Sequence, residues 1–332
     1  MTFTPVATQN PAQPEPVFSA SSTSDLAGEL ERLMPETPAA GLCSAEARAF
    51  HDAGQAWIFS VTRDRLTLGH AFGVVKRGRK RAELFVTLIQ SAPGGEVFWI
   101  GLRNFVARQH ITDLVVNCVA LGKSGETIPA FSRETSRFVD EHLYVIELAR
   151  NEGPRRLSSN NRRNIVRATK AGVAVINLTR EQAVDTHFVM TGTSLSRREK
   201  RGESTALRSP RQNVLALLET QGAQLFQAAL DGQVISSMLV FMFGRHGYYY
   251  DGGTSQNGME LGASHFLMNH IIGALKESGA KTLNMGIAAS TNPGLIRYKE
   301  GFSPDVWIVQ RVSSDQATPY KLIRNMATAW LR

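Results

Sequence analysis

Residues 223–250 read AQLFQAALDGQVISSMLVFMFGRHGYYY, and this stretch decides the fold. It contains two apolar runs, Leu225–Leu230 and Val234–Phe243, and ends in three consecutive tyrosines, Tyr248–Tyr250. The Asp231-Gly232 pair between the two runs is typical of a tight hairpin turn. Because aliphatic and aromatic runs of this length favour strands, the stretch predicts three consecutive antiparallel strands.

A helix and a fourth strand are expected next. Within 262–278 the apolar residues recur at helical spacing, and Gly279 is a natural stop. Residues 282–286 (TLNMG) are short enough for a buried strand, and residues 251–261, rich in glycine, read as a loop. The predicted order is therefore three strands, a loop, a helix and a strand, with a short helix before Phe302.

Two motifs flank this core. Residues 157–165 read LSSNNRRNI, and residues 294–302 read GLIRYKEGF, in which an aromatic–lysine pair precedes Gly-Phe. Together they resemble the opening and closing signatures of the catalytic half of the Fem-type peptidyltransferases. The strand and helix order resembles the core of the GCN5-related N-acyltransferase (GNAT) superfamily. We identify the chain as similar to the Fem-like branch of that superfamily over most of residues 57–312, which implies an α/β fold of two tandem GNAT-like halves.

The N-terminal part of the chain repeats the same order of elements. Strands are expected at 56–61, 67–75, 83–89 and 111–119, with a helix at 101–108 before the last of them. Two tandem halves and two unrelated α/β stretches both fit this pattern, and the resemblance favours the first. We expect a disordered tail over 1–24, an N-terminal half over 25–150 that acts as scaffold, and a catalytic half over 151–332.

Composition narrows the class of protein. The formal net charge of +8 fits a polyanionic partner, although a generic basic surface fits equally well. The only cysteines are Cys43 and Cys118, so no disulfide framework is expected, and a cytoplasmic location fits. No apolar run is long enough to cross a membrane, and the first residues lack the pattern of a secretory signal. A monomer is compatible with the sequence, which does not decide the oligomeric state.

Basic residues gather at two places ahead of the core. The predicted helix 159–171 carries a basic face, and a polar segment near residue 200, expected to be a mobile loop, carries a second cluster. Either group can neutralise phosphates or can simply be solvated. We predict a tRNA-binding role for both groups, which comprise Arg156, Arg162, Arg163, Arg167, Lys170, Arg197, Arg198, Lys200 and Arg201.

The resemblance also implies which residues carry the chemistry. Acyl transfer to an amine needs an activated ester or thioester and a donor for the oxyanion, but no protein nucleophile. In the Fem-like enzymes the lysine of the aromatic–lysine pair lies at the donor site, so Lys299 and Tyr298 are the expected catalytic pair. Asp251 is expected to take the amine proton, to hold the acceptor ammonium, or only to cap a turn. The expected substrate-binding residues are Tyr248, Tyr250, Asn284 and Asn292, and no metal cluster is apparent.

The acyl donor can be a coenzyme A thioester or a charged tRNA. Coenzyme A enzymes hold the pyrophosphate on a Gly-rich loop at the start of a helix, which corresponds to residues 259–263, MELGA. Met259 stands where a basic or amide residue is usual, and Glu260 repels phosphate. We therefore predict charged tRNA as donor and no bound cofactor, with acyl-CoA as the alternative and a non-catalytic tRNA-binding module as the third. Because no long helical arm is apparent, the expected acceptor is a small amine, a natural-product intermediate or a peptidoglycan precursor.

Overall fold

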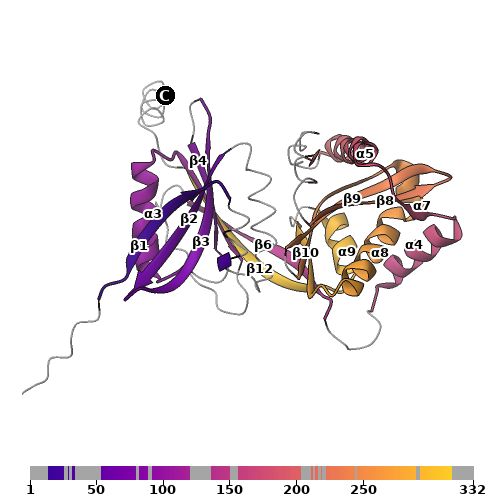
Figure 1. The fold of residues 1–332 in the computed structure, drawn as a ribbon. Helices are drawn as coiled ribbons and strands as arrows, with labels where there is room; N and C mark the ends of the chain where they lie inside the picture. The colour runs from indigo at the N-terminus through magenta and orange to yellow at the C-terminus, as the bar shows by residue number, and fades with distance from the viewer. Residues whose placement is uncertain are drawn as a thin grey trace, which may run out of the picture.

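The computed structural model has two α/β halves joined through shared central strands (Figure 1). The residues that it describes are 14–25, 29, 32–33, 54–79, 82–88, 92–119, 136–149, 156–202, 211, 214–215, 218, 222–243, 245–288 and 292–315.

The N-terminal half is a five-stranded stretch of sheet covered by one helix. Its elements are β1 (Val17–Thr23), β2 (Gly54–Arg63), β3 (Leu66–Arg77), β4 (Ala82–Leu88), α3 (Glu96–Arg108) and β5 (Asp113–Val119). The buried face of α3 packs on β2, β3 and β4 through an aromatic-rich core that includes Phe59, Phe98 and Leu102. The four strands and the helix predicted here are confirmed.

The disordered tail predicted over 1–24 is wrong for residues 17–23, which form strand β1. Residues 17–23 pair antiparallel with β2, from Val17 opposite Thr62 to Thr23 opposite Ala56. The Phe18 ring lies directly over Gly101 of α3, where a side chain would collide with it. Proline and serine made the segment resemble a tail, but the ring contact and the backbone pairing fix it. Residues 1–13 of the predicted tail lie outside the described part of the chain.

The C-terminal half consists of a second run of strands with helices on both faces. Its elements are α4 (Ser159–Lys170), β7 (Ala174–Ile176), α5 (Arg180–Lys200), β8 (Ala223–Leu230), β9 (Gln233–Phe243), β10 (His246–Thr254), α7 (Gln256–Leu261), α8 (Ala263–Glu277), β11 (Thr282–Ala288) and α9 (Pro293–Glu300). Helices α4 and α8 lie together on one face of these strands, and α5 lies on the other (Figure 1). The three strands, helix and strand predicted from residues 223–286 are confirmed.

Two segments of this half differ from the sequence prediction. The loop expected over 251–261 is the end of β10 followed by α7, whose first turn is capped by the Ser255 side chain accepting from the Gly258 N–H at 3.0 Å. The basic segment expected as a mobile loop is the C-terminal end of α5, which continues to Lys200. A polar sequence such as RREK carries no periodic apolar signal, so its helical continuation was not visible.

One continuous twelve-stranded sheet runs through both halves, in the order β1-β2-β3-β4-β5-β12-β6-β11-β10-β9-β8-β7. Strands β6 (Ser136–Glu147) and β12 (Asp305–Asp315) cross between the halves at its centre (Figure 1). Strand β12 pairs antiparallel with β5 on one side and with β6 on the other. Although β12 lies near the end of the C-terminal half in sequence, it also pairs with β5 of the N-terminal half, and the sequence did not reveal this.

Candidate functional site

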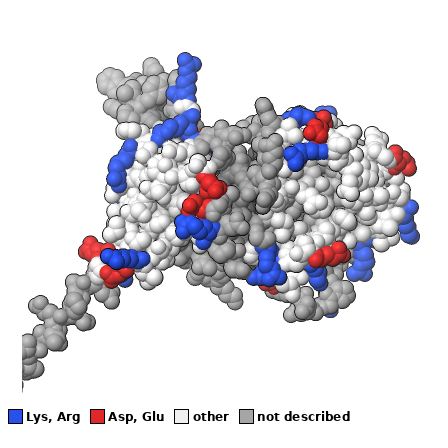
Figure 2. Space-filling view, viewed as in Figure 1, with Lys and Arg blue, Asp and Glu red and all other residues white. Residues whose placement is uncertain are grey.

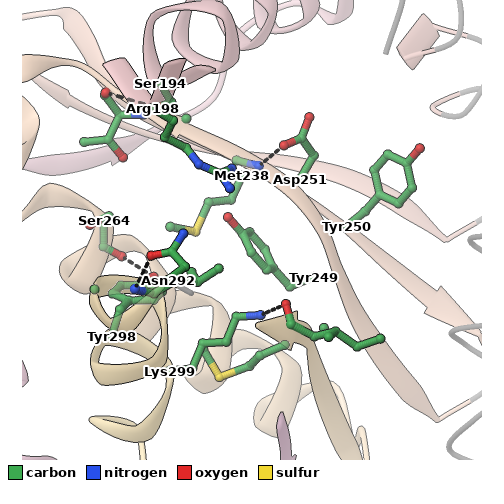
Figure 3. A pocket seen from close by; sticks show the side chains of 18 of the residues that line it. Ser194, Arg198, Met238, Tyr249, Tyr250, Asp251, Ser264, Asn292, Tyr298 and Lys299 are labelled. Atoms are coloured by element: carbon green, nitrogen blue, oxygen red, sulfur yellow. Dashed lines mark hydrogen bonds between the residues drawn. The ribbon is translucent and has the colours of Figure 1, made fainter. Parts of the chain in front are cut away.

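The pocket of interest opens where two neighbouring parallel strands part. Strands β10 and β11 pair only from His246 opposite Thr282 to Tyr248 opposite Asn284, although β10 continues to Thr254 and β11 to Ala288. Each strand carries an irregularity just beyond that point, between Tyr249 and Asp251 on β10 and between Asn284 and Ile287 on β11. The resulting wedge holds a pocket of about 790 Å³ whose walls also include α5, α8 and α9 (Figure 3).

Helix α9 brings Lys299 to the floor of this pocket. The helix is started by Asn292, whose Oδ1 accepts from the Leu295 N–H at 3.1 Å, and by Pro293 in its first turn. The Lys299 side chain is 3% exposed, and its Nζ donates to the Ile287 carbonyl of β11 at 2.8 Å. Burial lowers the pKa of Lys299 to about 7. Near neutral pH this amine can therefore be protonated or neutral, according to what binds beside it.

Tyr298 lies against the same wall and ties α9 to two other helices. Its hydroxyl donates to the Ser264 carbonyl of α8 at 3.2 Å, and its own carbonyl accepts from Asn161 Nδ2 of α4 at 3.3 Å. The phenol is buried, which raises its pKa well above the usual value. Tyr298 therefore stays neutral and orients α9, although it also lines the pocket.

The tyrosine run meets the pocket differently from the prediction. Tyr248 and Tyr250 line the pocket, but both pack with Phe241 on the α5 side of the sheet. Tyr249, which the sequence analysis left out, lies on the opposite face with its ring between Asn292 and Asp251 (Figure 3). Burial raises the pKa of the Tyr249 phenol far above the usual range. The alternation of side chains along a strand could have revealed that the middle tyrosine faces away from its neighbours.

Asp251 brings a carboxylate to the upper wall. Its Oδ1 accepts from the Gly252 N–H at 2.7 Å, and its Oδ2 lies 3.9 Å from His187 Nε2 of α5. The Asp251 side chain is 38% exposed, so an incoming ligand can reach it. The pocket therefore has an acidic group and a basic group, Asp251 and Lys299, on different walls.

Arginines at the C-terminal end of α5, and Arg201 just beyond it, line the pocket wall near Asp251. Arg197, Arg198 and Arg201 belong to this lining, whereas the exposed Lys200 does not. Arg197 Nη2 donates to the Thr254 carbonyl at 2.7 Å and to Ser194 Oγ at 3.1 Å. Its Nη1 is buried and has no hydrogen-bond partner among the described residues. Burial, and then the charge of Arg201, lower the pKa of Arg197. A negatively charged ligand at this wall would relieve both effects.

The basic residues near α4 lie on the surface, and none of them lines the pocket. Arg156, Arg162, Arg163, Arg167 and Lys170 are all exposed. Arg167 Nη1 donates to the Glu260 carbonyl at 2.8 Å and so joins α4 to α7. On the face drawn in Figure 2, basic side chains are dispersed over both halves and are interspersed with acidic ones. A single continuous basic patch is not visible on this face.

Asn284 does not line the pocket, in contrast to the predicted substrate contact. The side chain is buried, and its Oδ1 accepts from the Gly286 N–H at 2.7 Å. Gly286 has a φ of 75°, a left-handed conformation that favours glycine. Asn284 thus shapes the irregularity by which β11 leaves β10, and Asn292 is the predicted amide that borders the cavity.

Within the described residues, no group of three or more His, Cys, Asp or Glu side chains could hold a metal ion. None of the helices in the described part of the chain is both long enough and apolar enough to cross a bilayer.

Comparison with known proteins agrees with this geometry. Residues 155–300 match the acetyltransferase (GNAT) domain family. The crystal structure of FemX superposes with a TM-score of 0.63 at 14% identity, covering 87% of this chain and 96% of that one.

Two other solved structures share the fold at low identity. The C-terminal domain of a protein from Agrobacterium fabrum named as a lysylphosphatidylglycerol synthetase has a TM-score of 0.53 at 14% identity, covering 92% of this chain and 95% of that one. A GCN5-related N-acetyltransferase from Sphaerobacter thermophilus has a TM-score of 0.50 at 13% identity, covering 90% and 96%. No curated protein matches the sequence significantly. Residues 155–300 therefore match the GNAT acetyltransferase domain family, and the chain as a whole shares its fold with FemX and with the synthetase domain.

Proposed function

We propose that this GNAT-family acyltransferase moves an aminoacyl group from a charged tRNA to the amine of a small molecule, a natural-product intermediate or a peptidoglycan precursor. The observation that carries the proposal is the buried Lys299 in the wedge between β10 and β11, which shares one pocket with the Asp251 carboxylate. A cation and a carboxylate on separate walls suit a reaction that takes a proton from an ammonium and creates an oxyanion nearby.

The proposed reaction replaces an ester C–O bond by an amide C–N bond. The acceptor enters as an ammonium ion and gives one proton to the Asp251 carboxylate. The neutral amine attacks the ester carbonyl carbon, so a C–N bond forms and the carbonyl oxygen becomes an oxyanion beside Lys299. The C–O bond to the terminal ribose then breaks, and the ribose oxygen takes the second amine proton. The proton on Asp251 leaves to solvent, and the products are an amide and uncharged tRNA.

Lys299 suits the role of oxyanion donor because of its surroundings. A protonated amine has three N–H donors, and only one is used by the Ile287 carbonyl. Because burial lowers the pKa of Lys299 to about 7, the developing negative charge can draw the amine fully into its protonated form. Stabilisation of this kind operates in the transition state more than in the bound ester.

The arginines of α5 support a donor with phosphate groups. Arg197 has a buried terminal nitrogen without a partner among the described residues, and Arg198 and Arg201 line the same wall. Guanidinium groups match phosphate oxygens in geometry as well as in charge. We assign these side chains to the 3′ end of the tRNA, and the exposed arginines of α4 to its backbone. A charged tRNA as donor also places the proposed reaction in the cytoplasm, with no bound cofactor.

An acyl-CoA donor is the second candidate, and the match to an acetyltransferase family favours it. The segment that would hold the pyrophosphate opposes it, because residues 256–261 form the short helix α7. Glu260 lies at the end of that helix, with its carboxylate accepting from Gln256 Nε2 at 2.9 Å. A carboxylate at this point repels a pyrophosphate.

One experiment separates the donors. The protein is incubated with a panel of amines and either a pool of charged tRNA labelled in the amino acid, or acyl-CoA with detection of free thiol. Amide formation that RNase abolishes supports the proposal, with Lys299→Ala as the inactive control. Thiol release without tRNA supports the acyl-CoA alternative. Saturable tRNA binding without turnover on any amine supports a non-catalytic tRNA-binding module.

A further inference from the structure

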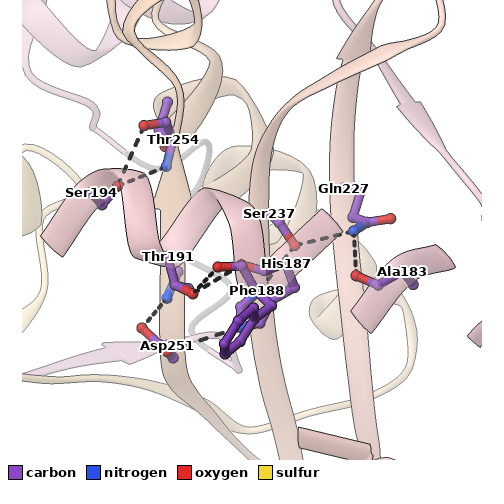
Figure 4. Close-up of polar contacts among 10 residues, drawn as sticks. Ala183, His187, Phe188, Thr191, Ser194, Gln227, Ser237, Asp251 and Thr254 are labelled. Carbon is purple, nitrogen blue, oxygen red and sulfur yellow. Dashed lines mark hydrogen bonds and ion pairs between the residues drawn. The ribbon is translucent and has the colours of Figure 1, made fainter. Parts of the chain in front are cut away.

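A buried chain of polar side chains runs behind the pocket wall and ends at Asp251 (Figure 4). It joins Gln227 of β8, Ser237 of β9 and His187 of α5, and each of these side chains is at most 1% exposed. Gln227 Nε2 lies 3.3 Å from Ser237 Oγ, and Ser237 Oγ lies 3.0 Å from His187 Nδ1. None of the three lines the pocket, so direct contact with a substrate does not explain them.

The chain favours a neutral His187 ring whose proton is on Nε2. Gln227 Nε2 donates to the Ala183 carbonyl at 2.9 Å and to Ser237 Oγ at 3.3 Å, so the hydroxyl hydrogen of Ser237 is available to donate to His187 Nδ1. An imidazole that accepts at Nδ1 carries its proton on Nε2. This N–H is the group that faces Asp251 Oδ2 at 3.9 Å, a distance for electrostatic attraction that a small side-chain rotation would convert to a hydrogen bond.

Packing alone does not explain why these three buried side chains are polar. Burial of three polar side chains costs free energy unless their hydrogen bonds are satisfied together. Apolar residues of the same volume would avoid this desolvation cost. Asp251 is held from two sides, because Oδ1 accepts from the Gly252 N–H while Oδ2 faces His187. These two contacts restrict the orientation of the carboxylate, which lines the pocket.

We propose that His187 is a positioning residue that, backed by Ser237 and Gln227, holds the Asp251 carboxylate in the orientation that takes the proton from the acceptor ammonium. This inference rests on the proposed function for its catalytic consequence. The hydrogen-bond arrangement behind it stands separately, and is tested without any substrate.

The first measurement is the protonation pattern of the His187 ring. Long-range ¹H–¹⁵N correlation spectra of the full-length, ¹⁵N-labelled protein near neutral pH are recorded for the wild type, for His187→Gln to assign the resonance, and for Ser237→Ala. We expect a proton on Nε2 in the wild type and a loss of this preference in Ser237→Ala. A wild-type ring with an unprotonated Nε2 would direct a lone pair at Asp251 and would overturn the proposal.

The second measurement is kinetic, with whichever donor supports amide formation. His187→Leu removes the group facing Asp251 and is expected to lower kcat by about 100-fold with little change in KM, as a misplaced reactive group does. His187→Gln keeps an N–H donor and is expected to recover most of the loss. Val184→Ala, at a fully buried position on the same helix, is the control for lost stability.

The outcomes separate a positioning role from a structural one. If His187→Leu and Val184→Ala lower kcat equally at matched melting temperature, or if His187→Gln recovers nothing, His187 is only a core residue. If no donor supports transfer, the proposed function fails, and the ring spectra still decide whether His187 faces Asp251 with a donor.

Discussion

Asn161 of α4 donates its side-chain amide to the backbone carbonyl of Tyr298 of α9 at 3.3 Å, across 137 positions of sequence. The Asn161 side chain also lies against Gly301, where any added Cβ would collide with it. The Ser158 N–H donates to the Gly301 carbonyl at 2.9 Å. The two sequence motifs that flank the core therefore contact each other in the folded protein. This contact sets the position of α9 and so of Lys299.

Gly301→Ala is expected to destabilise the protein by about 1–3 kcal/mol through overpacking against Asn161. The backbone gives no other reason for glycine here, because its φ of −61° suits any residue. In an Asn161→Ala background the side-chain atoms that the new Cβ would meet are removed, so its cost falls. Denaturant unfolding of the four proteins of this cycle measures the coupling. Additive effects would mean that Asn161 does not impose the glycine.

Lys299→Ala is expected to lower turnover about 100–1000-fold, the usual loss when one oxyanion donor is removed. Binding of tRNA should change little, since Lys299 lies on the pocket floor and not on the exposed basic surface. Single-turnover kinetics at saturating tRNA, together with a filter-binding isotherm, separate the two effects. Lys276→Ala, an exposed position on α8, is the matched control. Near-normal turnover of Lys299→Ala would refute the assigned role.

Lys299→Met is expected to raise the free energy of unfolding near pH 7, and less so at higher pH. Burial lowers the pKa of Lys299 to about 7 in the folded protein, from 10.5 in an unfolded chain. Between these values the unfolded chain binds the extra proton, so wild-type stability rises with pH across that window. The methionine variant lacks this dependence. Urea unfolding at pH 7 and pH 10 tests it, and a constant difference between the two proteins would contradict it.

Arg163→Ala is expected to weaken tRNA binding and to reduce the slope of log K against log salt by about 1, the share of one phosphate. Arg163 is exposed on the first half of α4. Arg167→Ala should act more broadly, because Arg167 also holds the Glu260 carbonyl. Arg180→Ala, at the opposite end of α5 from the pocket arginines, is the control. An unchanged slope for Arg163→Ala would mean that the α4 surface is only solvated.

His265→Phe is expected to flatten the loss of stability in acid. Burial, and then the charge of Arg167, lower the pKa of His265 to about 4 from 6.5. Stability is therefore lost as pH falls from 6.5 towards 4, where the unfolded chain takes up a proton that the folded one does not. Melting temperatures between pH 7 and pH 4 measure the slope, with the exposed His110→Asn as control. Equal slopes in wild type and His265→Phe would exclude His265 as the source.

Local patterns were enough to predict the core elements of the C-terminal half. Three strands, a helix and a strand followed from apolar runs and turn residues, and Lys299 followed from its motif. In each case the residues that carry the signal are close in sequence, so their spacing is readable without the fold. The tRNA donor, the domain boundaries and the roles assigned to the site residues, Lys299 included, remain predictions.

Features that depend on distant contacts were not readable. Asn284 turns to Gly286 because β11 leaves its partner β10 there. Strand β1 depends on Phe18 meeting Gly101, and the buried chain at His187 joins three elements. Such contacts are decided by packing between elements and leave no periodic trace along the chain.

The place of β12 in the sheet also delays completion of the sheet during synthesis. Strand β5 leaves the ribosome long before residues 305–315, which cover its free edge in the finished protein. At about 5–20 residues per second, the intervening segment takes roughly 10–40 s to make. During that interval an unpaired edge can recruit strands from other chains. Nascent chains halted before residue 305 should therefore depend on chaperones, and released full-length chains should not.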